Sequence, residues 1–371
     1  MGLTAAKLIS LLEQAIVVAD DPLKKKAVLA EVFAPMGFGA DAELDPGNFL
    51  SAEQTKTILR GLIKLSAAEK KASYDQRVTL RDARIVALEK ISVWADGAPR
   101  ISPVFSSVDR YDVAVQMALR VRRPSSMNQG PQGFCGPASV VVPWLRDNPS
   151  AYVDFVTGLF ESGLAQLGGR AVDVRGAGAF LKAWHAGCGP AADYIALGSL
   201  RADVEMIVDS LSGGGTVFSF FQPESHATTP QQIAKLLEQA GYGNVQNRVL
   251  TDYTAPRDKT GLVAAGISLG NCANVLSSNP GSVVIMLVNG VLAKNAKRQT
   301  AIAGNAHVAR LADLHWILVR RMTATGLYIN PPELVGTVSM KLYTWKWSGL
   351  ADFSLGDFLP RYFGYISAEP A

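Results

Sequence analysis

Apolar residues recur at helical spacing near the start of the chain, where Leu8, Leu11 and Leu12 begin one such stripe. Two serine-led segments further on, Ser51-Ala-Glu-Gln54 and Ser66-Ala-Ala-Glu69, fit the capping box. In that motif the serine hydroxyl accepts a hydrogen bond from a backbone amide, and the acid or amide three residues later reaches back. The pattern predicts helices over residues 55–65 and 70–94, within a helical N-terminal domain that spans residues 1–120.

The pattern becomes mixed after residue 120, and a second domain is expected over residues 121–371. Helical spacing and stop signals predict helices over residues 150–166, 177–186, 201–212 and 229–240. Apolar, β-branched or alternating segments predict strands over residues 216–221, 281–290, 315–321, 326–330 and 342–347, with a turn over residues 323–326. Helices followed by antiparallel strands define an α+β fold class.

Composition narrows the classes of partner. Hydrophobic residues make up 48% of the chain, charged residues 18%, and the net charge is +4. Positive charge is scattered, which argues against a nucleic-acid partner, because phosphate binding needs clustered cations. The longest apolar run, from Val283 to Val288, is far below the ~20 residues of a membrane span.

The cysteines bear on chemistry and compartment. Three cysteines, without C-x-x-C spacing, favour reduced thiols and neither a disulfide framework nor a structural zinc site. The N-terminus lacks the pattern of a secretory signal peptide. We therefore expect no metal or organic cofactor, and a protein that is cytoplasmic or is exported without such a signal.

The segment Gln129-Gly-Pro-Gln-Gly-Phe-Cys135-Gly-Pro-Ala-Ser139 carries the strongest chemical signal. Proline is favoured in the first helical turn, so Cys135 is expected at a helix N-terminus, where the helix dipole favours a thiolate. The backbone amide of Cys135 and the side-chain amide of Gln129 would then stabilise an oxyanion. Gln132 is the alternative donor.

A base for this thiol is expected far downstream. His315 opens the apolar segment His-Trp-Ile-Leu-Val319 and could accept the thiol proton, with Asn330 as the residue that orients the imidazole. The other candidates for the base are His185, His226 and above all His307. His315 is preferred because it directly precedes a strand and because Asn330 follows at a suitable interval.

These residues together resemble the papain-like cysteine peptidases. Cys135-Gly-Pro-Ala-Ser139, followed by His315 and by Asn330-Pro331, is most similar to the bacteriocin-processing type, over about residues 125–350. The resemblance implies a two-lobed fold, with the cysteine on a helix of one lobe, the histidine on a sheet of the other, and a peptide substrate between them. The interval from Cys135 to His315 is longer than the ~130–150 residues of papain-type enzymes, and Pro143 interrupts the expected helix.

The leading hypothesis is a cysteine hydrolase that cleaves a peptide or isopeptide bond through a thioester on Cys135, with His315 as base. A glutamine deamidase or a transglutaminase would form the same thioester. A catalytically silent binding module is the alternative from another class. The helical N-terminal domain would dock a partner, and by analogy the whole chain would suit a bacterial effector or toxin.

Overall fold

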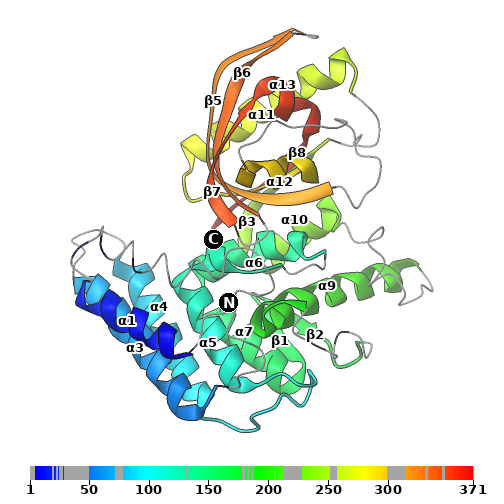
Figure 1. Cartoon of the computed structure of the whole chain (residues 1–371). Helices are drawn as coiled ribbons and strands as arrows, with labels where there is room; N and C mark the ends of the chain where they lie inside the picture. Colours follow the sequence, from blue (N-terminus) through cyan, green and yellow to red (C-terminus); the bar gives the residue numbers. More distant parts are fainter. Residues whose placement is uncertain are drawn as a thin grey trace. The chain divides into compact units, whose positions relative to one another are not determined.

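The computed structural model has an α+β fold, with eleven α-helices and two antiparallel sheets among the residues that it describes (Figure 1). Those residues are 5–18, 21, 24, 28, 50–71, 78–129, 133–177, 181, 184, 188–212, 228–250, 257–298, 314–330, 333–344 and 347–370. The chain divides into two compact units. The first comprises Met1–Phe134 and Val141–Gly215, and the second comprises Cys135–Val140 and Thr216–Ala371.

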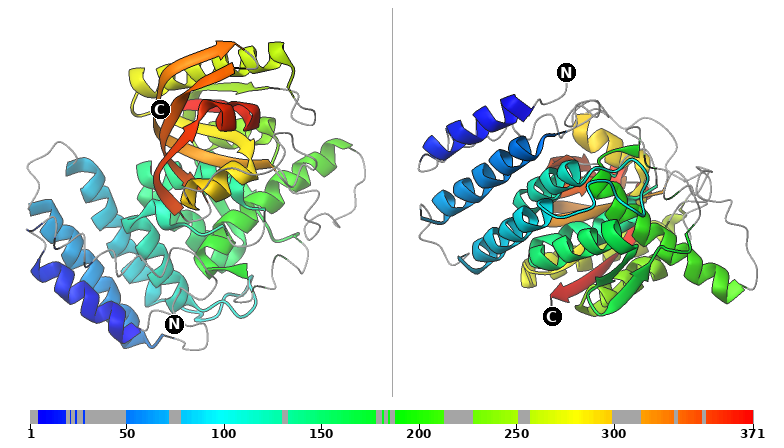
Figure 2. Two further views of the ribbon diagram at one scale, coloured as in Figure 1. Left: turned by 45° about the horizontal axis from the view of Figure 1, so that its top comes forward. Right: turned by 90° about the horizontal axis from the view of Figure 1, so that it is seen from below.

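The first unit is mainly helical. Helices α1, α3 and α4 lie side by side, and α4 also packs on α5 and α7 (Figure 2). A short β-hairpin, β1–β2, packs on α7 and α9. The bounds are α1 Ala5–Val17, α3 Ala52–Lys71, α4 Val78–Ala95, α5 Arg110–Arg122, η1 Pro124–Ser126, α7 Pro149–Ser162, β1 Leu164–Leu167, β2 Arg170–Asp173 and α9 Ala191–Ser212.

A buried ion pair joins two helices of this unit. Arg120 on α5 donates to both carboxylate oxygens of Asp193 on α9, at 2.7–3.0 Å, and both side chains are almost fully buried. The backbone amide of Asn128 donates to the same carboxylate at 2.7 Å. Because a buried charge is costly without partners, this pair requires both helices and the Asn128 segment to keep their places.

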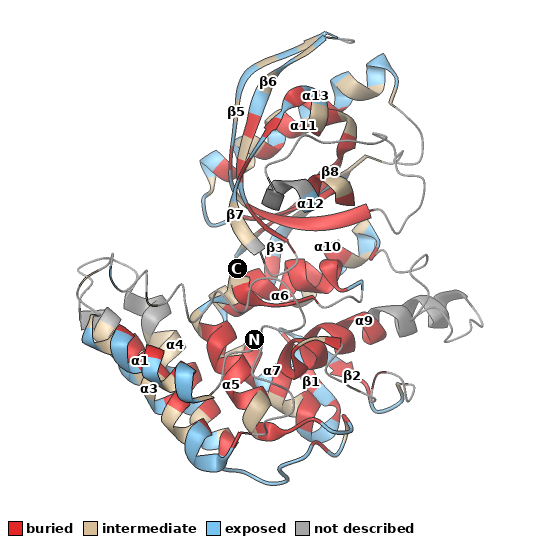
Figure 3. Ribbon diagram, viewed as in Figure 1, coloured by how far each residue is buried: buried red, intermediate tan, exposed pale blue. Residues whose placement is uncertain are grey.

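The second unit is built on a six-stranded antiparallel sheet, with strand order β3-β8-β4-β5-β6-β7. Strands β5 and β6 form a long hairpin that passes from buried residues to exposed ones towards its tip (Figure 3). The bounds are α10 Pro230–Gln239, β3 Tyr242–Val249, α11 Lys259–Ser278, β4 Val283–Asn289, α12 Gly290–Arg298, β5 Leu314–Asn330, β6 Glu333–Thr344, β7 Trp347–Ser354, α13 Leu355–Phe358, η5 Leu359–Arg361 and β8 Tyr362–Pro370.

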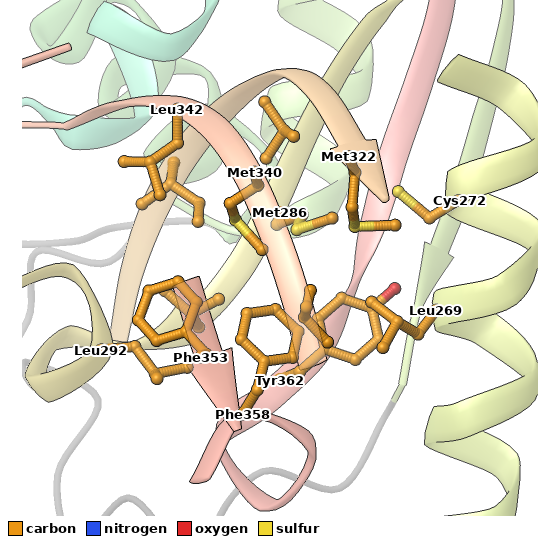
Figure 4. Close-up of a cluster of buried hydrophobic side chains, with 14 of the residues drawn as sticks. Leu269, Cys272, Met286, Leu292, Met322, Met340, Leu342, Phe353, Phe358 and Tyr362 are labelled. Atoms are coloured by element: carbon orange, nitrogen blue, oxygen red, sulfur yellow. The ribbon is translucent and has the colours of Figure 1, made fainter. Parts of the chain in front are cut away.

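One face of this sheet carries a core cluster. Leu269 and Cys272 of α11, together with Phe358 of α13, cover methionines and Leu342 from the central strands (Figure 4). Strand β4 is buried along its whole length, as expected for a strand with both faces covered. This burial explains why its sequence is a continuous apolar run and not an alternating one.

Helix α11 is the one described helix that meets the length and hydropathy criteria of a membrane span. It packs on β5 and β8, and its residues Ala265, Leu269, Cys272 and Leu276 belong to the core cluster. A core helix of a globular protein meets the same criteria, so α11 is weak support for a membrane span.

Local sequence signals account for several elements. Ser51 and Gln54 form the expected reciprocal capping bonds at the start of α3, at 3.1 and 2.9 Å. Thr229 caps α10 in the same way, and Gly241 follows it with φ +89°. The second expected capping box is wrong: Ser66 lies inside α3, where its hydroxyl donates to the carbonyl of Leu62 at 2.9 Å.

The compact units differ from the two domains expected from the sequence, since the first unit runs on to Gly215 and the second takes Cys135–Val140 from its middle. The domain boundary near residue 120 stays a prediction. The expected turn over residues 323–326 is wrong. Gly326, with φ +62°, lies at an irregularity within β5, which continues in the same direction.

Candidate functional site

Cys135 is the first residue of helix α6, which spans Cys135–Asp147. Phe134 occupies the N-cap position, and its side chain makes no capping hydrogen bond to the helix. The thiol side chain is largely buried, with the residue 8% exposed. The helix start places partial positive charge beside the sulfur, which favours the thiolate needed for nucleophilic attack. Pro143 lies inside α6, so the helix continues through the expected break.

Gly136 packs against Thr228 of the second unit. A Cβ built at Gly136 would lie 2.2 Å from Thr228 Oγ1 and 2.4 Å from Thr228 Cβ, which leaves no room for a side chain. The carbonyl oxygen of Thr228 accepts a hydrogen bond of 2.8 Å from Trp316 Nε1 on β5. Thr228 therefore links the start of α6 to the start of β5, so the neighbours of Cys135 and His315 share one contact residue.

His315 is buried near the beginning of β5, with 4% of its surface exposed. Its Nε2 lies 2.6 Å from Thr344 Oγ1 on β6. Burial lowers the pKa of His315 to about 3, and the charge of Lys294 acts in the same direction. The imidazole is therefore neutral at physiological pH, but a ring with a pKa near 3 is a weaker base than one that titrates near the operating pH.

The side chains of His315 and Trp316 lie on opposite faces of β5. His315 lies opposite Val288 in the register and shares its face with Ile317, and both of these residues belong to the core cluster. Side chains alternate along a strand, so Trp316 and its partner Thr228 lie on the opposite face. The link through Thr228 thus joins backbone segments, and a direct contact between Cys135 and His315 stays a prediction.

Asn330 does not orient His315. Both residues are on the same strand, β5, and at ~3.3 Å per residue they lie about 50 Å apart along it. Asn330 is at the exposed end of the hairpin, where its side chain donates to the hydroxyl of Tyr328 at 3.1 Å. The hairpin returns to His315 only at Thr344, which sequence reasoning did not single out.

Gln129 belongs to the first unit and is 2% exposed. Neither the nitrogen nor the oxygen of its side-chain amide has a hydrogen-bond partner among the described residues. A buried amide without partners is costly and marks a position where a ligand could satisfy it. The ion pair of Arg120 and Asp193 holds the preceding residue, Asn128, through its backbone amide. The role of Gln129 beside Cys135 stays a prediction.

The rival candidates Gln132, His185, His226 and His307 lie outside the described residues. Cys135, Cys188 and Cys272 are all buried, and none of them forms a disulfide within the described part of the chain. In the described part of the chain, no three histidine, cysteine or acidic side chains gather as metal ligands. Thr344 lies in the alternating segment that starts at Leu342, which predicts a strand. That Thr344 is next to His315 follows only from the length of the β5–β6 hairpin, which the sequence pattern does not specify.

No family model matches the chain, and no curated protein or solved structure matches it.

Proposed function

We propose that this chain is a cysteine-dependent hydrolase of amide bonds, with a peptide or isopeptide substrate. Cys135 attacks the carbonyl carbon, the amine leaves with a proton, and water then hydrolyses the thioester. His315 accepts the thiol proton and returns it to the leaving amine. Deamidation and transglutamination share the thioester and differ only in the substrate or the group that resolves it.

The placement of Cys135 is the observation that carries this proposal. Its thiol stands at the start of a 13-residue helix whose N-cap residue, Phe134, gives no side-chain hydrogen bond, beside a glycine that packs closely on Thr228. The nearby amides of the first turn are suitable oxyanion donors. The same unit supplies a neutral, hydrogen-bonded histidine at the strand that Thr228 contacts.

A second candidate function, a catalytically silent binding module, is favoured by the direction of the His315 side chain. The imidazole lies on the core-cluster face of β5, and Thr228 with Gly136 packs on the other. A histidine that serves only to bond Thr344 would have this environment. The two candidates differ in whether the reactivity of Cys135 depends on His315.

The test is the rate at which iodoacetamide alkylates each cysteine between pH 4 and pH 9, followed by peptide mass spectrometry. Cys188 is the matched internal control, because it is 6% exposed and Cys135 is 8% exposed. The enzyme proposal expects Cys135 to react faster than Cys188 below pH 8, with a profile that changes in His315→Ala. Similar rates for the two thiols, unchanged by His315→Ala, would support the binding module.

Amide hydrolysis is then measured on a mixture of peptides, with Cys135→Ala as the inactive variant and Cys188→Ala as the control. The proposal expects a thioester adduct on Cys135, detectable by mass in the acid-quenched reaction. Hydrolysis that survives in Cys135→Ala would overturn the assignment of the nucleophile.

A further inference from the structure

Strand β7, which spans Trp347–Ser354, is at one end of the large sheet and pairs with β6 alone within the described part of the chain. Its eight residues pair with β6 without a bulge, and among them only Asp352 is charged. Native edge strands are usually short, bulged or protected by lysine or proline, because their free backbone groups can pair with another chain. Since β7 has none of these features, its outer edge can accept a further strand.

The exposed face of the sheet beside β7 carries two unmatched positive charges. Arg321 on β5 lies directly opposite Lys341 on β6, and Lys341 lies opposite Leu350 on β7, whose surface is 70% exposed. Both cations are exposed, and neither forms an ion pair among the residues that the structure describes. Like charges directly opposite each other destabilise a sheet. An acidic side chain beyond Leu350, in the same row across the strands, would reduce this repulsion.

The sequence of β7 supplies that acid when the strand meets a second copy of itself. If two β7 strands run antiparallel with their Ala351 residues opposite each other, Asp352 of each copy lies opposite Leu350 of the other. Asp352 then enters the row of the partner's Lys341, two strands away, at about 10 Å between Cα atoms. The long stem of lysine can cross the exposed leucine and bring the two charges together.

The core-facing side of β7 is compatible with the same register. Ala351 and Phe353 belong to the core cluster, so this side also includes Gly349. In the register centred on Ala351, Phe353 of each copy lies opposite Gly349 of the other, the only glycine of the strand. An aromatic residue beside an edge glycine covers backbone that would otherwise stay exposed. Both faces of the strand are therefore complementary to themselves in one register.

We propose that β7 is a dimerisation edge, where a second copy of this chain adds its own β7 in antiparallel orientation and continues the sheet. The same residues of both copies form the contact, as in any two-fold symmetric interface. Asp352 of each copy pairs with Lys341 of the other. This proposal uses neither Cys135 nor His315, so it is independent of the proposed function.

Sedimentation velocity of the full chain from about 1 to 200 µM measures the association, because a contact of one strand pair is small and gives a concentration-dependent dimer. The wild type should dimerise. Lys341→Glu and Asp352→Lys should each raise the Kd about tenfold or more, since each substitution brings like charges together across the interface. Lys259→Glu is the control, a charge reversal at the exposed start of α11, and should dimerise like the wild type.

An equimolar mixture of Lys341→Glu and Asp352→Lys should recover the dimer, because each copy then carries the charge that the other lacks. Loss of folding cannot produce this recovery, and melting curves by circular dichroism show that each variant is folded. Hydrogen exchange followed by mass spectrometry locates the contact: peptides that cover residues 347–354 should exchange more slowly at high protein concentration in the wild type.

Three results would overturn the proposal. They are a wild-type monomer at every concentration, a dimer without protection of residues 347–354, and a mixture of folded variants that does not recover the dimer. A monomer would leave the edge of β7 to an extended segment of another protein.

Discussion

At Gly136 the close approach of Thr228 leaves no space for any side chain. Because a Cβ there would overlap both Oγ1 and Cβ of Thr228, either the helix start or the Thr228 segment has to move in Gly136→Ala. We expect Gly136→Ala to lower the free energy of unfolding by about 1–3 kcal/mol, as overpacking does. Urea denaturation followed by circular dichroism measures the change.

Gly270 provides the comparison, since it is also helical, in α11, and has nothing within 4 Å of a built Cβ. Gly270→Ala should stabilise the protein by about 0.5–1 kcal/mol, because alanine reduces the entropy of the unfolded chain. Equal effects of the two substitutions would show that Thr228 does not constrain Gly136.

His315 links stability to pH. The unfolded chain protonates this residue below about pH 6.5, and the folded chain only near pH 3, because burial disfavours the charged ring. Between these two pH values the unfolded state binds more protons at His315, so the free energy of unfolding decreases as the pH falls. The stability that depends on the neutral imidazole is therefore complete above pH 6.5 and is lost as the pH falls towards 3. The slope reaches about 1.4 kcal/mol per pH unit.

His315→Gln should remove that slope, which denaturant unfolding at several pH values between 4 and 7 will show. Asp112, whose pKa burial raises to about 6, titrates in both proteins, so only the difference between them is assigned to His315. An identical pH dependence in the two proteins would contradict the burial of a neutral imidazole.

Thr55 and Thr344 are both buried threonines, but their hydroxyl groups differ in hydrogen bonding. Thr55 Oγ1 is buried without a hydrogen-bond partner among the described residues, whereas Thr344 Oγ1 bonds His315. Thr55→Val should therefore be neutral or stabilise the protein by about 1 kcal/mol, and Thr344→Val should destabilise it by a similar amount. Thermal unfolding of both variants against wild type measures the contrast.

At the scale of elements, the β5–β6 hairpin explains why the candidate site was only partly predictable. Local signals such as the capping residue Thr229 act over a few residues and can be found in the sequence. The partner of His315 depends on where the hairpin reverses, and Gly326 resembles a reversal although the strand continues. The bond to Thr344 spans 29 residues, a pairing that no local pattern specifies.

Gly326 makes this interpretation testable. Its φ of +62° is unfavourable for most residues, and nothing lies within 4 Å of a built Cβ, so the cost of substitution is conformational. Gly326→Ala should destabilise the second unit by about 1 kcal/mol, and Gly326→Asn by less, because asparagine tolerates the left-handed region. Melting temperatures of the two variants should differ in that order, and the reverse order would argue against a left-handed residue at this position.

At the scale of the whole molecule, the α+β class could be predicted because it depends on summed patterns along the chain. The division into units could not, because Cys135–Val140 clusters with residues far downstream although its sequence neighbours belong to the first unit. Contacts such as that of Gly136 with Thr228 depend on three-dimensional packing, and no change in composition marks them.

A fragment of residues 216–371 tests that division. It retains all six strands of the large sheet but lacks Gly136, which packs on the side chain of Thr228. A synthetic peptide of residues 133–148 should raise the melting temperature of this fragment in a concentration-dependent way, because it binds only the folded state. The same peptide with Gly136→Ala should have a weaker effect, and equal effects would contradict a specific contact.

The course of α6 also limits how such a protein can be rearranged in evolution. A single crossover between genes transfers one continuous stretch of coding sequence, yet the second unit is encoded in two stretches that flank part of the first. A recombinant that acquired only the downstream stretch would receive the sheet and His315 without Cys135. The thiol and the sheet are therefore inherited together only when the Val141–Gly215 part of the first unit travels with them.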